Sequence, residues 1–75
     1  MVRYPAMRDW RAILGRNVRR LRQQKGLTQE QLAFDAEIDL TYMGAIERGK
    51  RNPSLLVMAR LADALSVSLT KLLSE

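Results

Sequence analysis

The sequence predicts a compact, all-α fold built from five helices. Two observations support this prediction. Apolar residues recur at helical spacing along most of the chain,. A capping or helix-stopping residue separates each periodic stretch from the next,. At 75 residues the chain is one small domain, near the lower size at which a single core suffices,.

The first helix should begin between Pro5 and Asp9 and end at Lys25, with Gly26 as its stop,. At 100° per residue, its inward side carries Met7, Trp10, Leu14, Val18 and Leu21,. Its outward side carries Arg8, Arg16, Arg19 and Arg20. Asn17 falls within the inward side, so we expect its amide to satisfy a buried backbone group,.

Two short helices should follow. Thr28 and Gln31 have the spacing of a capping box for the second helix, whose inward residues are Leu32, Ala33 and Ala36,. Glu37 and Ile38 then form a turn. Asp39 should cap a third helix that runs to about Arg48, with an inward side formed by Tyr42, Met43 and Ile46,.

Ser54 should cap a fourth helix, and Ser68 should open a short last one,. The residues expected to face inward are Leu55, Met58, Leu61, Ala62 and Leu65 in the fourth helix and Leu69, Leu72 and Leu73 in the last. No repeat, low-complexity tract or linker interrupts the chain. Residues 1–8 are therefore interpreted as a basic arm or helix start, and residues 9–75 as the single domain.

Charge is distributed unevenly. The chain carries a net charge of +5, and residues 1–25 hold eight cations and one acid. Residues 26–50 hold two cations and five acids. A basic domain favours a polyanionic partner, although arginines on a solvated helix face would give the same composition.

The composition also excludes several classes of function. The chain has no cysteine and no histidine, which removes disulfides, thiolate metal sites and Cys–His or Ser–His nucleophiles,. We therefore predict no enzymatic activity, no catalytic residue, no metal and no cofactor. The opening residues lack the apolar run of an export signal, and no segment has membrane-spanning length,. The expected location is the cytoplasm, in association with the nucleoid.

The second and third helices, at about residues 28–48, have the spacing of a helix-turn-helix unit,. Ala33 permits the close helix crossing, and Ile38 fills the turn. The outward side of the third helix is nearly bare until Arg48, because it carries Leu40, Thr41, Gly44 and Ala45. Such a helix fits the major groove of DNA, which is about 12 Å wide.

Three blocks, "LTQEQLA", "DLTYMGAIERGKRNPSL" and "LADALSVSLTKLL", resemble the phage-repressor/Cro-type helix-turn-helix family, also called the XRE family. The likeness covers about Asn17 to Leu73. It implies a lambda-repressor-like domain and a sequence-specific regulator of transcription that binds double-stranded DNA as a homodimer on a pseudo-palindromic operator. The "TYxxxIERGxRNPS" portion also resembles the controller proteins of restriction-modification systems.

The resemblance implies a role for individual residues. Those that match base-facing positions are Leu40, Thr41, Gly44 and Ala45. Those that match phosphate-contacting positions are Gln29, Tyr42, Arg48, Lys50, Arg51 and Asn52. Arg22 and Glu47 match a structural ion pair between the first and third helices. Dimerisation is expected through the last two helices, with Val67, Leu69, Leu72 and Leu73 at the interface.

The chain departs from the family where glycine is usual, at Glu37 and Ser66. Either these residues adopt a left-handed conformation, at about 1 kcal/mol each, or the turns differ. Leu56 and Val57 replace a usual polar pair, which points to a partner surface. An antitoxin-like protein-binding module with secondary DNA binding is therefore the alternative function. RNA polymerase or a toxin would be the protein partner, and RNA binding is a more remote reading.

Two further assignments have alternatives. Trp10 is expected in the core or at a subunit contact, with base stacking as the other option. The arginines of the first helix form a solvated face, contact phosphates or bind an acidic partner. Arg3 and Arg8 are candidates for an arm that lies along DNA.

Overall fold

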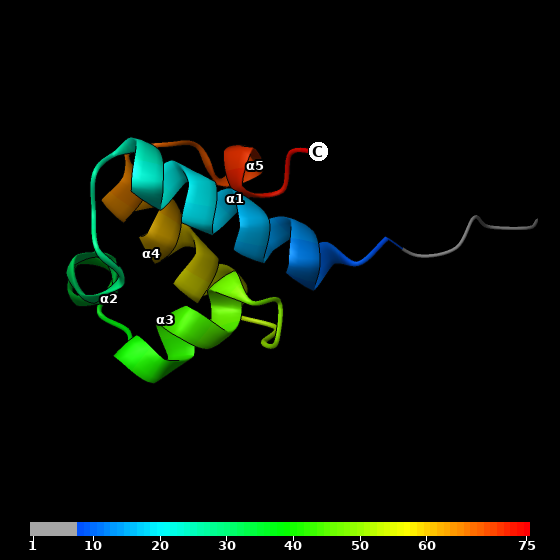
Figure 1. Cartoon of the computed structure of the whole chain (residues 1–75). Helices are drawn as coiled ribbons and strands as arrows, with labels where there is room; N and C mark the ends of the chain where they lie inside the picture. The colour runs from blue at the N-terminus through cyan, green and yellow to red at the C-terminus, as the bar shows by residue number, and fades with distance from the viewer. Residues whose placement is uncertain (1–7) are drawn as a thin grey trace, which may run out of the picture.

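The computed structural model describes residues 8–75 and contains five α-helices (Figure 1). These are α1 (Trp10–Gln24), α2 (Gln29–Ala36), α3 (Leu40–Glu47), α4 (Leu55–Leu65) and α5 (Leu69–Leu72). Helix α1 packs against α3 and α5, while α4 packs against α2 and α5. No strand occurs between residues 8 and 75, so the all-α prediction is confirmed. None of the described helices combines the length and apolar character needed to span a membrane.

Most helices begin where the capping residues predict. The Thr28–Gln31 capping box is present, with Thr28 Oγ1 accepting from the Gln31 amide at 3.0 Å and Gln31 Oε1 accepting from the Thr28 amide at 2.8 Å. Asp39 Oδ2 accepts from the amide of Thr41 at 2.9 Å, and Ser54 Oγ accepts from that of Val57 at 3.2 Å. Side-chain acceptors at these positions satisfy amides that have no partner within the helix.

The ends of the first and last helices differ slightly from the prediction. Helix α1 starts at Trp10, because Asp9 lies outside the helix and its Oδ1 accepts from the amide of Ala12 at 3.2 Å. Ser68 precedes α5 but makes no capping bond; its hydroxyl group pairs with that of Thr70 at 3.1 Å. Met7 and Arg3 lie outside the described residues.

The core is formed by inward side chains from all five helices. The largest fully buried side chains are Val18, Leu32, Met43, Ile46, Leu61 and Leu72. Asn17 is the buried polar residue of the described chain, and its Nδ2 donates to the carbonyl oxygens of Leu72 at 2.8 Å and Ser74 at 2.7 Å. The amide thus ties α1 to the chain terminus at the end of α5, as its position on the inward side predicts.

Both non-glycine positions in the turns adopt the left-handed conformation. Glu37 and Ser66 each have φ of 58°. Backbone bonds close both helix ends, from Ile38 N to Ala33 O at 2.9 Å and from Val67 N to Ala62 O at 3.0 Å,. The geometry of the family turn is therefore kept without glycine, at a cost of about 1 kcal/mol per residue.

Two predictions about burial are wrong, and one residue assigned to the dimer interface lies in the core. Trp10 is 43% exposed, so it is not a core residue and the subunit-contact and base-stacking alternatives stay open. Leu55 is 65% exposed, because it stands in the first turn of α4 and lies 80° around the helix from Leu65, which is buried,. Leu72 is fully buried, which confirms its predicted inward position and leaves none of its surface for a dimer interface.

Candidate nucleic-acid interface

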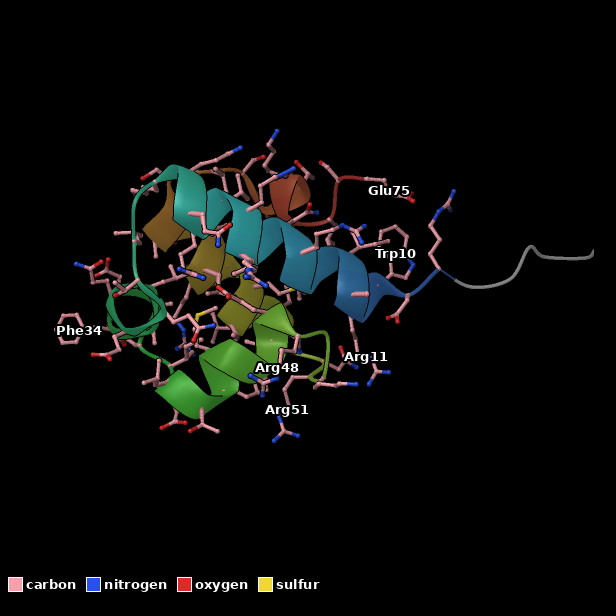
Figure 2. All side chains as sticks on the ribbon, viewed as in Figure 1. Trp10, Arg11, Phe34, Arg48, Arg51 and Glu75 are labelled. Atoms are coloured by element: carbon pink, nitrogen blue, oxygen red, sulfur yellow. The ribbon has the colours of Figure 1, made fainter. Side chains whose placement is uncertain are left out.

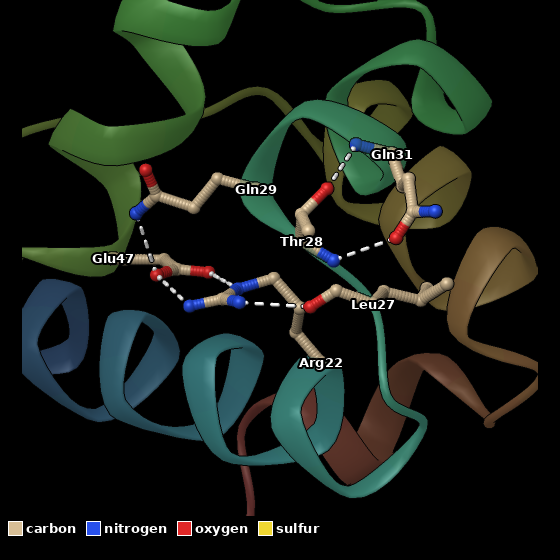
Figure 3. A network of polar contacts seen from close by, with 6 residues as sticks. All are labelled: Arg22, Leu27, Thr28, Gln29, Gln31 and Glu47. Atoms are coloured by element: carbon tan, nitrogen blue, oxygen red, sulfur yellow. Dashed lines mark hydrogen bonds and ion pairs between the residues drawn. The ribbon is translucent and has the colours of Figure 1, made fainter.

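An ion pair fixes the carboxyl end of α3 against α1 (Figure 3). Arg22 Nε donates to Glu47 Oε2 at 2.6 Å, and Arg22 Nη2 donates to Glu47 Oε1 at 3.2 Å. The side chain of Glu47 is 3% exposed and that of Arg22 is 13% exposed. Arg22 Nη1 also donates to the carbonyl oxygen of Leu27 at 2.9 Å. The pairing expected from the family is therefore present and links α1, α3 and the segment before α2.

Gln29 joins this network from the first position of α2. Its Nε2 donates to Glu47 Oε1 at 2.9 Å (Figure 3). This bond uses one of the two amide hydrogens, so the second remains available to a ligand. The amino end of α2, which is the expected phosphate contact, is thereby held in place beside α3.

The exposed side of α3 begins with Leu40 and Thr41. Leu40 is 44% exposed, and Thr41 is exposed at the outer surface. Asp39 lies directly before them, and its Oδ2 caps the helix. The amino end of α3 therefore presents an apolar group, a hydroxyl group and a carboxylate.

Gly44 and Ala45 are less accessible than the sequence suggests. Ala45 is 5% exposed, so the expectation that its methyl group faces a base is not supported by its position and is withdrawn. Gly44 is also buried, because two long side chains cover it. A methyl group at Gly44 would lie 3.1 Å from Arg48 Nη1 and 3.7 Å from Gln29 Oε1. Gly44 can meet a base only if the Arg48 side chain moves aside.

Cations collect at the carboxyl end of α3 and in the loop that follows. Three exposed cations lie here, Arg48, Lys50 and Arg51, and none of them forms an ion pair within residues 8–75. The neutral side chain of Asn52, next in the chain, is also exposed. Gly49 allows this turn, since its φ of 73° favours glycine,. Tyr42 lies apart from this group, half-buried with its side chain packed against the core.

Two glycines bring the first turns of α1 against this basic loop. A methyl group at Gly15 would clash with the carbonyl oxygen of Ile46, and one at Gly49 would lie 3.1 Å from Ala12 Cα. The helices are therefore in backbone contact. Arg11 consequently lies on the same side of the molecule as Arg48 and Arg51 (Figure 2). No pattern in the sequence distinguished Arg11 from the other arginines of the first helix, and the signal that could have identified it is the pair of small residues on facing elements.

The expected dimer residues other than Leu72 are partly accessible. Val67, Leu69 and Leu73 are half-buried and pack against the core. Leu55 and Leu56, in the first turn of α4, are 65% and 66% exposed. Val57 is half-buried and packs against the core. Exposed apolar side chains are thus available on α4, and partly accessible ones on and beside α5.

No cluster of metal-ligating side chains occurs in the part of the chain that the structure describes. The described polar groups form ion pairs, caps and a cationic edge. Such an arrangement can bind anions.

Comparison with known proteins agrees with this geometry. The helix-turn-helix family matches residues 18–72. The chain is 41% identical over 66 residues to an uncharacterized HTH-type transcriptional regulator, y4dJ, of Sinorhizobium fredii. This alignment covers 88% of this chain and 86% of that one. The chain is 44% identical over 67 residues to the control protein C.SmaI of Serratia marcescens, with 89% and 80% covered.

A solved structure has a similar fold. The crystal structure of the restriction-modification controller protein C.AhdI from Aeromonas hydrophila superposes with a TM-score of 0.81 at 44% identity. The match covers 83% of this chain and 94% of that chain.

Proposed function

The chain belongs to the helix-turn-helix family of DNA-binding transcriptional regulators, and from this premise we propose that it binds a pseudo-palindromic operator as a homodimer. The observation that carries the proposal is the position of the unpaired cations. Arg48, Lys50 and Arg51 follow directly after the exposed side of α3. A helix in the major groove and cations beside it would contact bases and backbone together.

Base recognition is assigned to the first residues of α3. Thr41 can donate or accept a hydrogen bond at a base edge, and Leu40 can contact a thymine methyl group. Neither side chain forms the bidentate contact with which arginine reads guanine. The affinity should therefore depend mainly on phosphates, and the base preference should favour sites that contain thymine. A selected motif fixed at several G·C pairs would contradict this assignment.

Phosphate binding is assigned to both ends of the helix-turn-helix unit. At one end, Gln29 combines a free amide hydrogen with the amino terminus of α2. At the other end, Arg48, Lys50, Arg51 and Asn52 supply cations and an amide. Tyr42 stays in the proposed set through its hydroxyl group, which forms no hydrogen bond within residues 8–75.

A salt series tests DNA binding on the segment upstream of the gene. The slope of log K against log[salt] should be about −0.9 for each phosphate contacted. Arg51→Ala should make this slope shallower by about 0.9 per bound subunit without changing base preference. Thr41→Ala should instead reduce discrimination at one base-pair position by roughly 1–3 kcal/mol. Failure of the wild-type chain to distinguish this segment from unrelated DNA would refute the proposal.

Dimerisation is proposed through Leu69 and Leu73, together with Val67 and the exposed leucines of α4. One domain of this size buries little DNA, and two-fold pairing doubles the contact on half-sites about 10 bp apart or a multiple of that spacing. Sedimentation at micromolar concentration should give a dimer. Leu56→Asp, at a position that is 66% exposed, should give a folded monomer that binds the operator weakly. A wild-type monomer at high concentration would contradict this part of the proposal.

The similar control proteins support a controller-type role, in which the dimer regulates transcription near its own gene. It would act either by excluding RNA polymerase or by recruiting it. A reporter fused to the upstream segment distinguishes the two modes, because expression falls in one case and rises in the other when the protein is supplied.

A protein-binding module of the antitoxin type is the second candidate. Leu56 at 66% exposed and Phe34 at 81% exposed favour it, because large apolar side chains at the surface are typical of contact sites,. Phe34 borders a hollow of about 350 Å³ with Leu27, Glu30, Gln31 and Asp35. Co-expression with the products of adjacent genes, followed by gel filtration, tests this function. A stable complex that forms equally well without DNA would favour it.

A further inference from the structure

Two adjoining hollows lie beside the first turn of α1, outside the helix-turn-helix unit. The larger, of about 480 Å³, is lined by Arg8, Asp9, Trp10, Arg11 and Asn52. The smaller, of about 170 Å³, shares Trp10, Arg11 and Asn52 and continues over apolar side chains. Trp10, Arg11 and Asn52 therefore stand at the boundary of both hollows, next to the loop that carries Lys50 and Arg51.

The first turn of α1 packs closely against the loop. Gly49 approaches Ala12 so closely that a methyl group would lie 3.1 Å from Ala12 Cα and 3.5 Å from the carbonyl carbon of Arg11. Gly15, one turn further along α1, contacts the end of α3 in the same way. Contacts this close leave no room for a side chain between the two backbones,. The backbone of Arg11 therefore lies close to the loop that carries Arg51.

Arg11 is the cation of this hollow that has no assigned partner. The Arg8 guanidinium pairs with Glu75 at 2.8 Å. The Asp9 carboxylate accepts from the amide of Ala12 at 3.2 Å and is occupied as the cap of α1. Arg11 is exposed and forms neither a side-chain hydrogen bond nor an ion pair within residues 8–75. Its charge is therefore available to a ligand.

We propose that Arg11 binds a phosphate of the DNA backbone beyond those reached by the loop, with the Asn52 amide as a second donor. This inference rests on the proposed function. Arg11 extends on the same side as Arg48 and Arg51, so one surface carries all three guanidinium groups (Figure 2). A guanidinium offers two parallel N–H groups to a phosphate, and an exposed arginine fixed at its backbone is well suited to that contact. The operator contact of each subunit then includes α1 as well as α2 and α3.

Arg20 supplies a matched control. It is exposed on the same helix and forms no ion pair within the described residues. It stands nine residues after Arg11, which at 100° per residue places it on the opposite side of α1. Arg11→Ala and Arg20→Ala both lower the net charge by one, so a difference between them reports position and not total charge.

The first measurement is operator affinity across a salt series. Arg11→Ala should make the slope of log K against log[salt] shallower by about 0.9 per bound subunit, which corresponds in 0.1 M salt to binding weaker by about eightfold per subunit and about sixtyfold for a dimer. Arg20→Ala should leave the slope unchanged. Arg11→Lys should restore the slope and not the full affinity, since lysine keeps the charge and loses the paired N–H groups. Equal slopes for Arg11→Ala and Arg20→Ala would overturn the proposal.

The second measurement identifies the phosphate. Single phosphates of the operator are replaced by uncharged methylphosphonates, one duplex at a time. Wild type and Arg20→Ala should lose affinity at a position that has no effect on Arg11→Ala. If every position that weakens wild type also weakens Arg11→Ala equally, Arg11 contacts no phosphate. Loss of specific binding by wild type itself would refute the proposed function, which separates the two failures.

Trp10 provides an independent readout because it is the single tryptophan of the chain. It is 43% exposed and lines both hollows. Operator binding should reduce quenching of its fluorescence by iodide in wild type and in Arg20→Ala, and the reduction should be smaller in Arg11→Ala. Quenching that DNA leaves unchanged in wild type would place the backbone away from this hollow and contradict the proposal.

Discussion

Replacement of Arg22 by methionine should strongly destabilise the domain, because it strands a buried charge. The side chain of Glu47 is 3% exposed and accepts two hydrogen bonds from Arg22. In Arg22→Met the carboxylate would keep the Gln29 amide, at 2.9 Å, as its donor within the network. Removal of one partner from a buried ion pair costs about 3–5 kcal/mol.

Replacement of Glu47 by methionine should lower the free energy of unfolding by less than Arg22→Met does. The Arg22 side chain is 13% exposed, so a guanidinium left without Glu47 can reach water and still bond to the Leu27 carbonyl oxygen. The double variant Arg22→Met with Glu47→Met removes both charges and should be more stable than Arg22→Met alone. Urea unfolding followed by circular dichroism measures each free energy of unfolding, and Arg22→Met should lower Tm by at least about 12 °C.

Two results would contradict the predicted role of the Arg22–Glu47 ion pair. A loss below about 1 kcal/mol for Arg22→Met would mean that the pair behaves like an exposed one. Additive losses in the double variant, within about 0.5 kcal/mol, would mean that the two charges do not interact. Salt gives a further check, because screening is weak for buried charges and the loss should persist in 1 M NaCl.

Three other substitutions test the geometry. Gly15→Ala should lower the free energy of unfolding by about 2 kcal/mol in urea titrations. The clash of the new methyl group with the Ile46 carbonyl oxygen outweighs the roughly 1 kcal/mol that alanine gains over glycine in a helix,. An unchanged stability would contradict the close crossing of α1 and α3. Glu37→Gly should raise the free energy of unfolding by about 1 kcal/mol, since φ of 58° suits glycine, and a loss of stability would show that the conformation carries no strain,. Asp39→Asn should keep the α3 cap and tighten operator binding in fluorescence anisotropy, because it removes an anion from the end of α3 nearest the proposed groove,. Weaker binding would indicate that the Asp39 carboxylate itself contacts the operator.

Local chemistry made most of the fold predictable. The capping residues Thr28, Asp39 and Ser54 mark helix starts through bonds to amides two or three residues away,. Such bonds depend on neighbouring residues alone. Periodicity similarly identified the inward sides of the helices. It failed at Leu55, where a first-turn position lies at the border of the inward arc and burial depends on what packs beside it.

The candidate site was predictable only in part. The order of residues after α3 placed Arg48, Lys50 and Arg51 together, because they are adjacent in the chain. Burial of Ala45 and the cover that Arg48 forms over Gly44 depend on side chains from other turns and helices. Periodicity around one helix contains no information about them.

The sequence alone determined the class of this molecule: five short helices, a basic excess and a nearly bare third helix, each of which follows from residues close together in the chain. The tertiary structure decided which surface those residues form. It brought α1 into backbone contact with the end of α3 through Gly15 and Gly49, and so placed Arg11 on the same side of the molecule as Arg51, forty residues away. Contacts over that separation depend on how the helices cross, which is set by packing of the whole core.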